Sequence, residues 1–234
     1  YYFLFGSWMK IFLTYSPERI FLRIPKKHKF FKHLTIKEKL IYSLTAINLL
    51  LNLFITLLLY KKKIELFGSI EKFKSWEHVD DFLDDNFGVE RVYVTTDSIV
   101  PAWFLNNENI TVINKHAGDT RKIRGLLPAF WSLYYGFPLA ITVHVVDPTI
   151  DNGRPLLIKE IDQKKVYSLL GFYKYIYFYI WPELFVQIHT GNLDLGVDDL
   201  KEVPIYKSWP NEAELSGFRE KSVLPYCVIN DVRQ

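Results

Sequence analysis

An uncharged segment of twenty residues, 41–60, constrains this chain more than any other feature. Its sequence, IYSLTAINLLLNLFITLLLY, contains no charged residue, proline or glycine. Twenty apolar residues in a helix span about 30 Å, the thickness of the hydrocarbon core of a bilayer. Tyr42 and Tyr60 would place one aromatic ring near each membrane interface. The segment therefore predicts one transmembrane helix over 41–60, with a helix buried inside a soluble protein as the alternative.

Polar residues within this segment recur at intervals of three, four and four, which places them on one face of a helix. Amide side chains in hydrocarbon need hydrogen-bond partners, and neighbouring helices usually supply them. We predict a helix–helix interface with other membrane-protein subunits at Thr45, Asn48, Asn52 and Thr56.

Basic residues are concentrated before this segment. Residues 1–63 hold twelve Lys or Arg and two acids, a balance of +10, whereas the remainder holds seventeen basic and twenty-four acidic residues, a balance of −7. The positive-inside tendency predicts that the domain after the span faces the side opposite the basic segment. Anionic lipid head groups are the ligands expected for Lys26, Lys27, Lys29 and Lys32, unless these side chains are simply solvated. The acidic remainder predicts no nucleic-acid partner.

The predicted organisation has four parts. A basic membrane-flanking segment, 1–40, precedes the transmembrane helix, 41–60. An α+β domain of helices and antiparallel strands follows over 64–190, and a proline-containing, extended, partner-binding tail occupies 191–234. Within the domain, Trp76, Val79 and Leu83 recur at helical spacing, and the β-branched runs 91–96 and 110–114 indicate strands.

Residues 126–146 form a second stretch without Asp, Glu, Lys or Arg. Pro128, Gly136 and Pro138 interrupt it, so a buried strand near its end is favoured over a second membrane span. A turn at 151–153 then predicts a hairpin with 156–161. Tyrosines alternate with other residues over 173–180, which is typical of a strand.

No motif in the sequence indicates catalysis. There is no glycine-rich phosphate loop, nucleophile elbow or zinc-binding helix motif, and the single cysteine, Cys227, excludes cysteine-cluster metal sites. The six histidines are scattered, and His144 is interpreted as a structural residue of a strand. The sequence thus predicts no catalytic residue, metal or cofactor. The alternative is an enzyme, which would be indicated if His144 or His189 lay beside a carboxylate in a cleft.

The function predicted from these features is that of a non-catalytic accessory subunit of a multi-subunit membrane complex. The basic flank and the Phe, Tyr, Ile and Lys bias point to a mitochondrial inner-membrane complex, either a respiratory complex or the ATP synthase. The alternative is an extracytoplasmic ligand-binding or sensor domain on a membrane anchor, which would require a pocket lined by aromatic and a few polar side chains.

Overall fold

The structure is a computed structural model that divides into two compact units. It describes residues 9–13, 35–37, 39–40, 69–72, 75–85, 89–95 and 99–162, and further along residues 169, 172, 175–176, 180–189 and 203–219. Unit 1 comprises Tyr1–Arg23, Leu50–Lys115 and His144–Arg154, and unit 2 comprises Ile24–Leu49, His116–Val143 and Pro155–Gln234.

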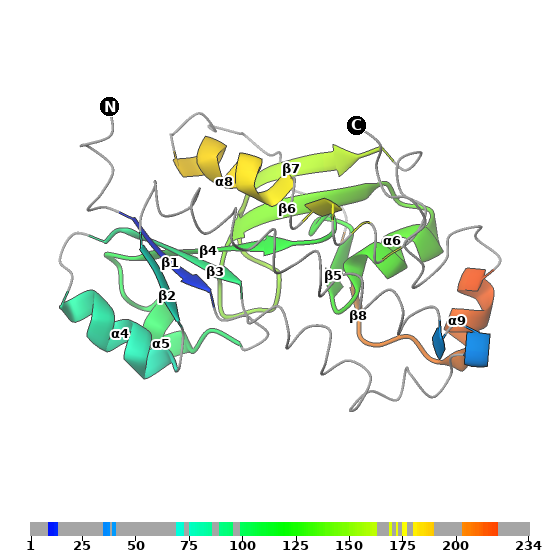
Figure 1. Cartoon of the computed structure of the whole chain (residues 1–234), viewed down its shortest axis with the longest axis horizontal. Helices are drawn as coiled ribbons and strands as arrows, with labels where there is room; N and C mark the ends of the chain where they lie inside the picture. The colour runs from blue at the N-terminus through cyan, green and yellow to red at the C-terminus, as the bar shows by residue number, and fades with distance from the viewer. Residues whose placement is uncertain are drawn as a thin grey trace. The chain divides into compact units, whose positions relative to one another are not determined.

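A six-stranded sheet has the strand order β2-β1-β3-β4-β6-β7 (Figure 1). Its strands are β1 (Met9–Leu13), β2 (Ser69–Lys72), β3 (Arg91–Thr95), β4 (Thr111–His116), β6 (Leu139–Val145) and β7 (Pro155–Ile161). The pairs β1–β2, β1–β3 and β3–β4 are parallel. Parallel strands occur almost only in sheets covered on both faces, and the continuous burial of β3 from Val92 to Val94 agrees with that rule.

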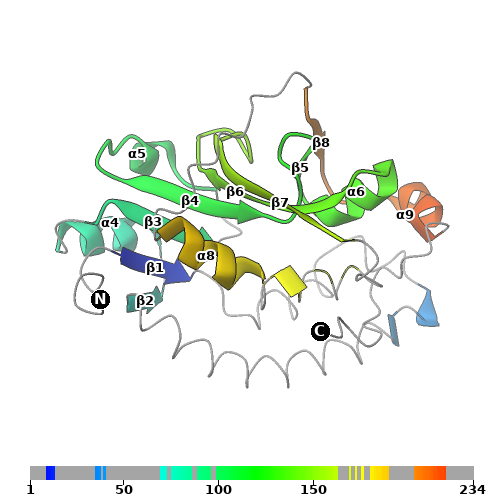
Figure 2. The same cartoon turned by 90° about the horizontal axis from the view of Figure 1, so that it is seen from above.

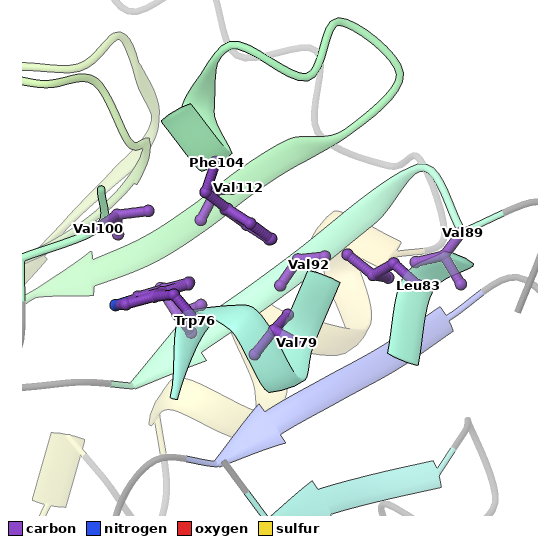
Figure 3. Packing of buried hydrophobic residues seen from close by; sticks show 9 residues of the cluster. Trp76, Val79, Leu83, Val89, Val92, Val100, Phe104 and Val112 are labelled. Atoms are coloured by element: carbon purple, nitrogen blue, oxygen red, sulfur yellow. The ribbon is translucent and has the colours of Figure 1, made fainter. Parts of the chain in front are cut away.

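The core of unit 1 lies between β3 and β4 on one side and two helices on the other. Helix α4 (Trp76–Asp84) begins after Ser75, whose hydroxyl accepts a hydrogen bond from the His78 backbone N–H. The helix buries Trp76, Val79 and Leu83, as its apolar spacing predicts, against Val92 and Val112 of the strands (Figure 3). Helix α5 (Ala102–Leu105) adds Phe104, whose ring centroid lies 5.1 Å from that of Trp76.

Unit 2 contains a second, two-stranded parallel sheet of β5 (Ile123–Gly125) and β8 (Ile205–Lys207). These strands lie side by side in both views, although about eighty residues separate them (Figure 2). Helix α6 (Pro128–Tyr135) follows β5, and α9 (Glu212–Arg219) follows β8 and stacks Phe218 on Phe130 of α6 with centroids 4.3 Å apart. The segment 205–219 is therefore built onto the residues that follow β4.

The strand predicted over 173–180 is wrong. The described residues there are helical and lead into α8 (Trp181–His189). A separate set of side chains explains the helix, because they recur every three or four residues and are all buried: Leu169, Phe172, Ile176, Ile180, Leu184 and Ile188. Burial of this stripe outweighs the alternation of the tyrosines between its members.

The prediction for residues 126–146 is confirmed in its main point. The stretch forms α6 and the buried strand β6, and β7 follows after the turn at 151–153, as the hairpin prediction requires. Trp131 and Phe130 of α6 are buried against protein. The stretch 126–146 therefore lacks charged residues because much of it is buried in the protein core.

The predicted fold class, a membrane-anchored α+β protein with one transmembrane helix, is wrong. Strand β1 precedes 41–60 and strands β2 and β3 follow it, yet β1 pairs with both in one sheet. Segments on the two sides of a single membrane crossing could not share a sheet, so the predicted placement of the domain opposite the basic segment is wrong too. Residues 41–60 themselves lie outside the described residues. Within the described ranges, no helix is long and apolar enough to cross a membrane.

Replacement of a core aromatic should destabilise unit 1 far more than replacement of its exposed neighbour. Phe104 is 1% exposed and Trp103, beside it on α5, is 46% exposed. We expect Phe104→Ala to lower the free energy of unfolding by about 3–5 kcal/mol, because it leaves a cavity. Trp103→Ala should cost about 1 kcal/mol, mainly its edge contact with Phe104. Urea unfolding followed by fluorescence and circular dichroism would measure both; equal losses would contradict the assigned core.

Candidate functional site

Polar side chains gather at the carboxyl end of β4. Asn114 is half-buried, and Lys115 and His116 are buried, at the end of a strand that otherwise buries Val112 and Ile113. Because side chains alternate along a strand, Asn114 and His116 lie on one face and Lys115 on the other. In open sheets of parallel strands, ligands bind at the carboxyl ends. A ligand-binding site is therefore expected at this end of β4.

His116 is held by a backbone carbonyl of β5. Its Nε2 lies 3.2 Å from the carbonyl oxygen of Ile123. A carbonyl only accepts hydrogen bonds, so this bond requires the proton on Nε2. In the neutral imidazole, the basic lone pair is then on Nδ1. The fold thus selects one tautomer and with it the ring atom that can take up a proton.

The loop between His116 and β5 is fixed by buried hydrogen bonds. The Thr142 hydroxyl donates to the Gly118 carbonyl oxygen at 2.7 Å and accepts from the Thr120 N–H at 3.2 Å. The buried Asp119 carboxylate accepts two hydrogen bonds from the Arg121 guanidinium, at 3.0 and 3.1 Å. Buried polar groups joined in this way hold a loop in one conformation.

The turn after β6 carries a second group of polar residues, in unit 1. Asp151 has a left-handed backbone with φ of 53°, unusual for a residue other than glycine. The Asp147 carboxylate accepts from the Thr149 N–H and from the Asn152 side chain, which closes the turn. Gly153 permits the return into β7, since a Cβ there would lie 1.7 Å from the Val145 carbonyl oxygen. A costly backbone conformation held by its surroundings is a common feature of functional sites.

His144 and Asp151 form a histidine–carboxylate pair in this turn. His144 Nε2 lies 3.9 Å from Asp151 Oδ1, and the two side chains are only 3% and 13% exposed. The separation is too long for a hydrogen bond but short enough for charges to interact. His144 Nδ1 lies 3.0 Å from the Val145 carbonyl oxygen. The interpretation of His144 as a structural residue therefore overlooked a carboxylate beside it.

Strand β6 runs antiparallel to β4. The Val146 N–H donates to the Val112 carbonyl oxygen, whereas Thr142 meets Gly118. Residue numbers thus rise along β4 as they fall along β6, and the two strands are neighbours in the sheet. His144 accordingly falls opposite the second half of β4, the half that includes Asn114. The sheet is mixed, with its parallel strands on one side and the β6–β7 hairpin on the other.

Lys115 is a buried lysine in the middle of the sheet. Burial lowers the pKa of its ammonium group from 10.5 to about 7, because desolvation penalises the charged form. Its side chain is on the face of β4 opposite Asn114 and His116. Lys115 is therefore expected to affect the stability of the fold and the pH dependence of that stability.

The predicted site residues all lie outside the described residues. This holds for the helix-interface residues Thr45, Asn48, Asn52 and Thr56 and for the lipid-binding residues Lys26, Lys27, Lys29 and Lys32. They stay predictions, as do the four-part division of the chain and the predicted partners. No cluster of three His, Cys, Asp or Glu side chains in the described part of the chain could hold a metal ion.

Sequence reasoning missed the polar residues at the end of β4 and in the turn after β6. The available signal was an Asn-x-His sequence at the end of the predicted strand 110–114, at the edge where ligands bind if the strands are parallel. The sequence predicts antiparallel strands, for which that edge has no special meaning. The parallel arrangement is set by the pairing of β3 with β4 and with β1, and β1 lies far away in sequence.

The fold is similar to that of several solved structures, among them formyltransferases. Methionyl-tRNA formyltransferase from Clostridium thermocellum matches with a TM-score of 0.53 and 13% identity, over 92% of this chain and 82% of that one. A Mycobacterium tuberculosis protein to which sugar N-formyltransferase activity is ascribed matches with a TM-score of 0.53 and 12% identity, over 92% and 87%. HypX from Aquifex aeolicus matches with a TM-score of 0.52 and 12% identity, over 92% of this chain and 34% of its own.

At these identities the likeness concerns the fold. No protein-family model matches this sequence, and no curated protein sequence matches it. The described part of the chain nevertheless resembles a formyltransferase domain with a mixed sheet and helices.

This likeness overturns the predicted function. The structural neighbours are formyltransferases, which contradicts a non-catalytic accessory subunit of a respiratory complex or ATP synthase. It equally contradicts the sensor alternative, the prediction that the chain is not an enzyme, and the assignment to the mitochondrial inner membrane. The physical reason for the error is that hydropathy records exclusion from water and does not distinguish lipid from protein as the excluding medium.

Lys115 should make the stability of the fold depend on pH. Between about pH 7 and 10.5 the unfolded chain holds a proton on Lys115 that the folded chain lacks, so stability rises with pH across this window. The slope from one group is at most about 1.4 kcal/mol per pH unit. We expect Lys115→Met to raise stability at pH 7.5 and to reduce this slope. Lys159→Met, at a more exposed lysine that pairs with Glu183, is the control. Urea unfolding at pH 7 to 9.5 would measure the effect, and an unchanged slope in Lys115→Met would contradict it.

Proposed function

We propose that this chain transfers a formyl group to the nitrogen of an amine. The observation that carries the proposal is His116, a buried imidazole at the carboxyl end of β4 whose Nε2 bond to Ile123 leaves Nδ1 as its basic atom. It is found in a chain with the fold of known formyltransferases. An amine attacks a carbonyl only when it is neutral, so acyl transfer to nitrogen needs a group that accepts its proton.

The chemistry of this transfer is simple to balance. The amine nitrogen forms a bond to the formyl carbon, and the bond between that carbon and the donor nitrogen breaks. The proton lost by the amine is taken up by a base, and a proton is delivered to the departing donor nitrogen. His116 Nδ1 is the group proposed to accept and return the proton.

Asn114 and Asp151 supply the other two side-chain chemistries that the reaction uses. Negative charge develops on the formyl oxygen during attack, and amide N–H donors stabilise such an oxyanion. Asn114, on the same face of β4 as His116, is the proposed donor. The Asp151 carboxylate, with His144 beside it, is proposed to stabilise the cationic amine as its proton leaves.

A reduced folate is the proposed formyl donor, since one neighbour, HypX from Aquifex aeolicus, is known in complex with tetrahydrofolic acid at a TM-score of 0.51. Folates present a flat ring system that needs apolar cover. In unit 1, Ile99 and Trp103 follow the carboxyl end of β3 and are exposed, whereas Val100 and Phe104 between them are buried. These two side chains fit that requirement and would hold the ring. The donor supplies an activated formyl group on nitrogen.

Removal of the His116 imidazole should abolish most of the activity. The assay offers amino sugars and methionyl-tRNA, acceptors named for the neighbours, together with a formylated tetrahydrofolate, and detects the formylated amine by mass spectrometry. We expect His116→Gln to lower kcat by about 10²–10⁴-fold, the usual contribution of a general base. His78→Gln, at a histidine of α4, should retain activity. Absence of both product and tetrahydrofolate binding with the unaltered chain would contradict the proposed function.

A parallel experiment tests the carboxylate. Asp151→Asn keeps the size of the side chain but removes its charge, and we expect kcat to fall by about 10²-fold or more. Asp147→Asn in the same turn leaves an amide oxygen to accept the Thr149 N–H and should have a much smaller effect. Equal activities of the two variants would remove Asp151 from the proposed chemistry.

A further inference from the structure

We propose that the segment 203–219 is a positioning element for His116. In this proposal, β8 and Lys207 hold β5 so that the Ile123 carbonyl fixes the imidazole with its proton on Nε2. The inference rests on the proposed function, because it concerns the residue assigned as base. It adds that a part of the chain about ninety residues further on determines which ring nitrogen is basic.

The pairing of β8 with β5 sets the direction in which the Ile123 carbonyl points. Strand β8 pairs with β5 in register from Ile123 with Ile205 to Gly125 with Lys207. The Ile205 N–H donates to the Lys122 carbonyl oxygen at 2.9 Å, so that carbonyl points toward β8. Successive carbonyls of a strand point to opposite edges. The Ile123 carbonyl therefore points away from β8, where it accepts from His116 Nε2.

Strand β8 is attached to α6 by side-chain contacts. The Lys207 ammonium group lies 4.7 Å from the ring centroid of Trp131 and 5.6 Å from that of Tyr135. The hydrogen bond that Lys207 donates to the Tyr135 hydroxyl oxygen is the main cause that raises the pKa of Lys207, so the ammonium stays charged and the cation–π contacts are maintained. The Trp131 indole N–H donates to the Ser208 carbonyl oxygen at 2.9 Å. Strand β8 is thus held by side chains as well as by its ladder.

Helix α9 completes the attachment through Glu214. Its carboxylate accepts from the Asn211 N–H at 2.9 Å, while the Asn211 side chain accepts from the Glu214 N–H, also at 2.9 Å. This reciprocal pair is a capping box, which fixes the start of a helix. The same carboxylate lies 3.3 Å from Lys207 Nζ. One glutamate therefore links the start of α9 to the lysine that holds β8 on α6.

Gly125 offers a way to separate β8 from β5 without touching His116. Its φ is +94°, and a Cβ at this position would lie 2.2 Å from the Lys207 carbonyl oxygen. That oxygen accepts the Leu126 N–H at 2.9 Å. Gly125→Ala must therefore push β8 away. Gly136 is a matched control, because its φ is +75° but a Cβ there would meet nothing within 4 Å; Gly136→Ala imposes similar backbone strain without the collision.

The test measures the tautomer of His116 directly. Nitrogen-15 NMR of the imidazole in the full 234-residue chain, at about pH 8.5 where an ordinary imidazole is neutral, distinguishes a proton on Nε2 from one on Nδ1. We expect the Nε2–H form alone in the unaltered chain and in Gly136→Ala. In Gly125→Ala, both forms should be populated. Lys207→Met should shift the signals in the same direction, and Lys207→Arg should restore them.

Two results would overturn the proposal. One is a proton on Nδ1 of His116 in the unaltered chain. The other is an unchanged Nε2–H form in Gly125→Ala while hydrogen exchange at Leu126 and Ile205 shows that the β5–β8 hydrogen bonds are lost. If Gly125→Ala does not fold, Lys207→Met and Trp131→Phe, which removes the indole donor to Ser208 and leaves a smaller ring, decide by the same criteria.

Measurement of kcat and KM for Gly125→Ala distinguishes failure of this inference from failure of the proposed function. If formyl transfer is detected, Gly125→Ala should lower kcat by about tenfold or more with little change in KM, since the base is misdirected while binding is retained. If the unaltered chain shows neither formyl transfer nor tetrahydrofolate binding and the tautomer nevertheless shifts as expected, the proposed function fails and the positioning of His116 by 203–219 remains.

Discussion

The parallel hydrogen bonding of β3 to both β1 and β4 is the interaction on which the rest of the structure depends. Parallel strands share a direction, so their carboxyl ends meet at one edge of the sheet. Burial of Val92 and Val112 beneath α4 and α5 holds the register of the β3–β4 pair. Asn114 and His116 then fall at the edge where α/β proteins bind ligands. Antiparallel pairing would leave these side chains without a common edge.

The proposed base is defined by a backbone atom more than by a side chain. An imidazole has two similar nitrogens, and a neighbouring acceptor decides which one keeps its proton. Here the acceptor is the Ile123 carbonyl oxygen, whose direction follows from the pairing of β5 with β8. Lys207, Trp131 and Glu214 hold β8 in place through contacts that have no role in bond making. Precision at the site is thus a property of the surrounding fold.

Hydropathy alone does not separate a membrane span from a segment buried in protein. A helix that is apolar on all sides is a membrane span or the interior of a protein, and the pattern of residues is the same in both cases. The stretch 126–146 shows the ambiguity, since its uncharged residues form α6 and the buried strand β6. The tyrosine alternation over 173–180 misled in a related way, because the aliphatic residues between the tyrosines set the period that burial selects.

What the sequence by itself determined is the local structure. The positions of α4, β3, β4, β6 and β7 follow from apolar periodicity, β-branched runs and turn residues, which act over a few neighbours. Three features depended on tertiary structure: the parallel sheet, the pairing of β1 with β3 across about eighty residues, and the approach of β8 to β5. Pairing partners distant in sequence leave no periodic signal, since either partner alone is only a short strand. His116 and Asp151 acquire their surroundings from those distant contacts, and for that reason the candidate site could be recognised only once the fold was known.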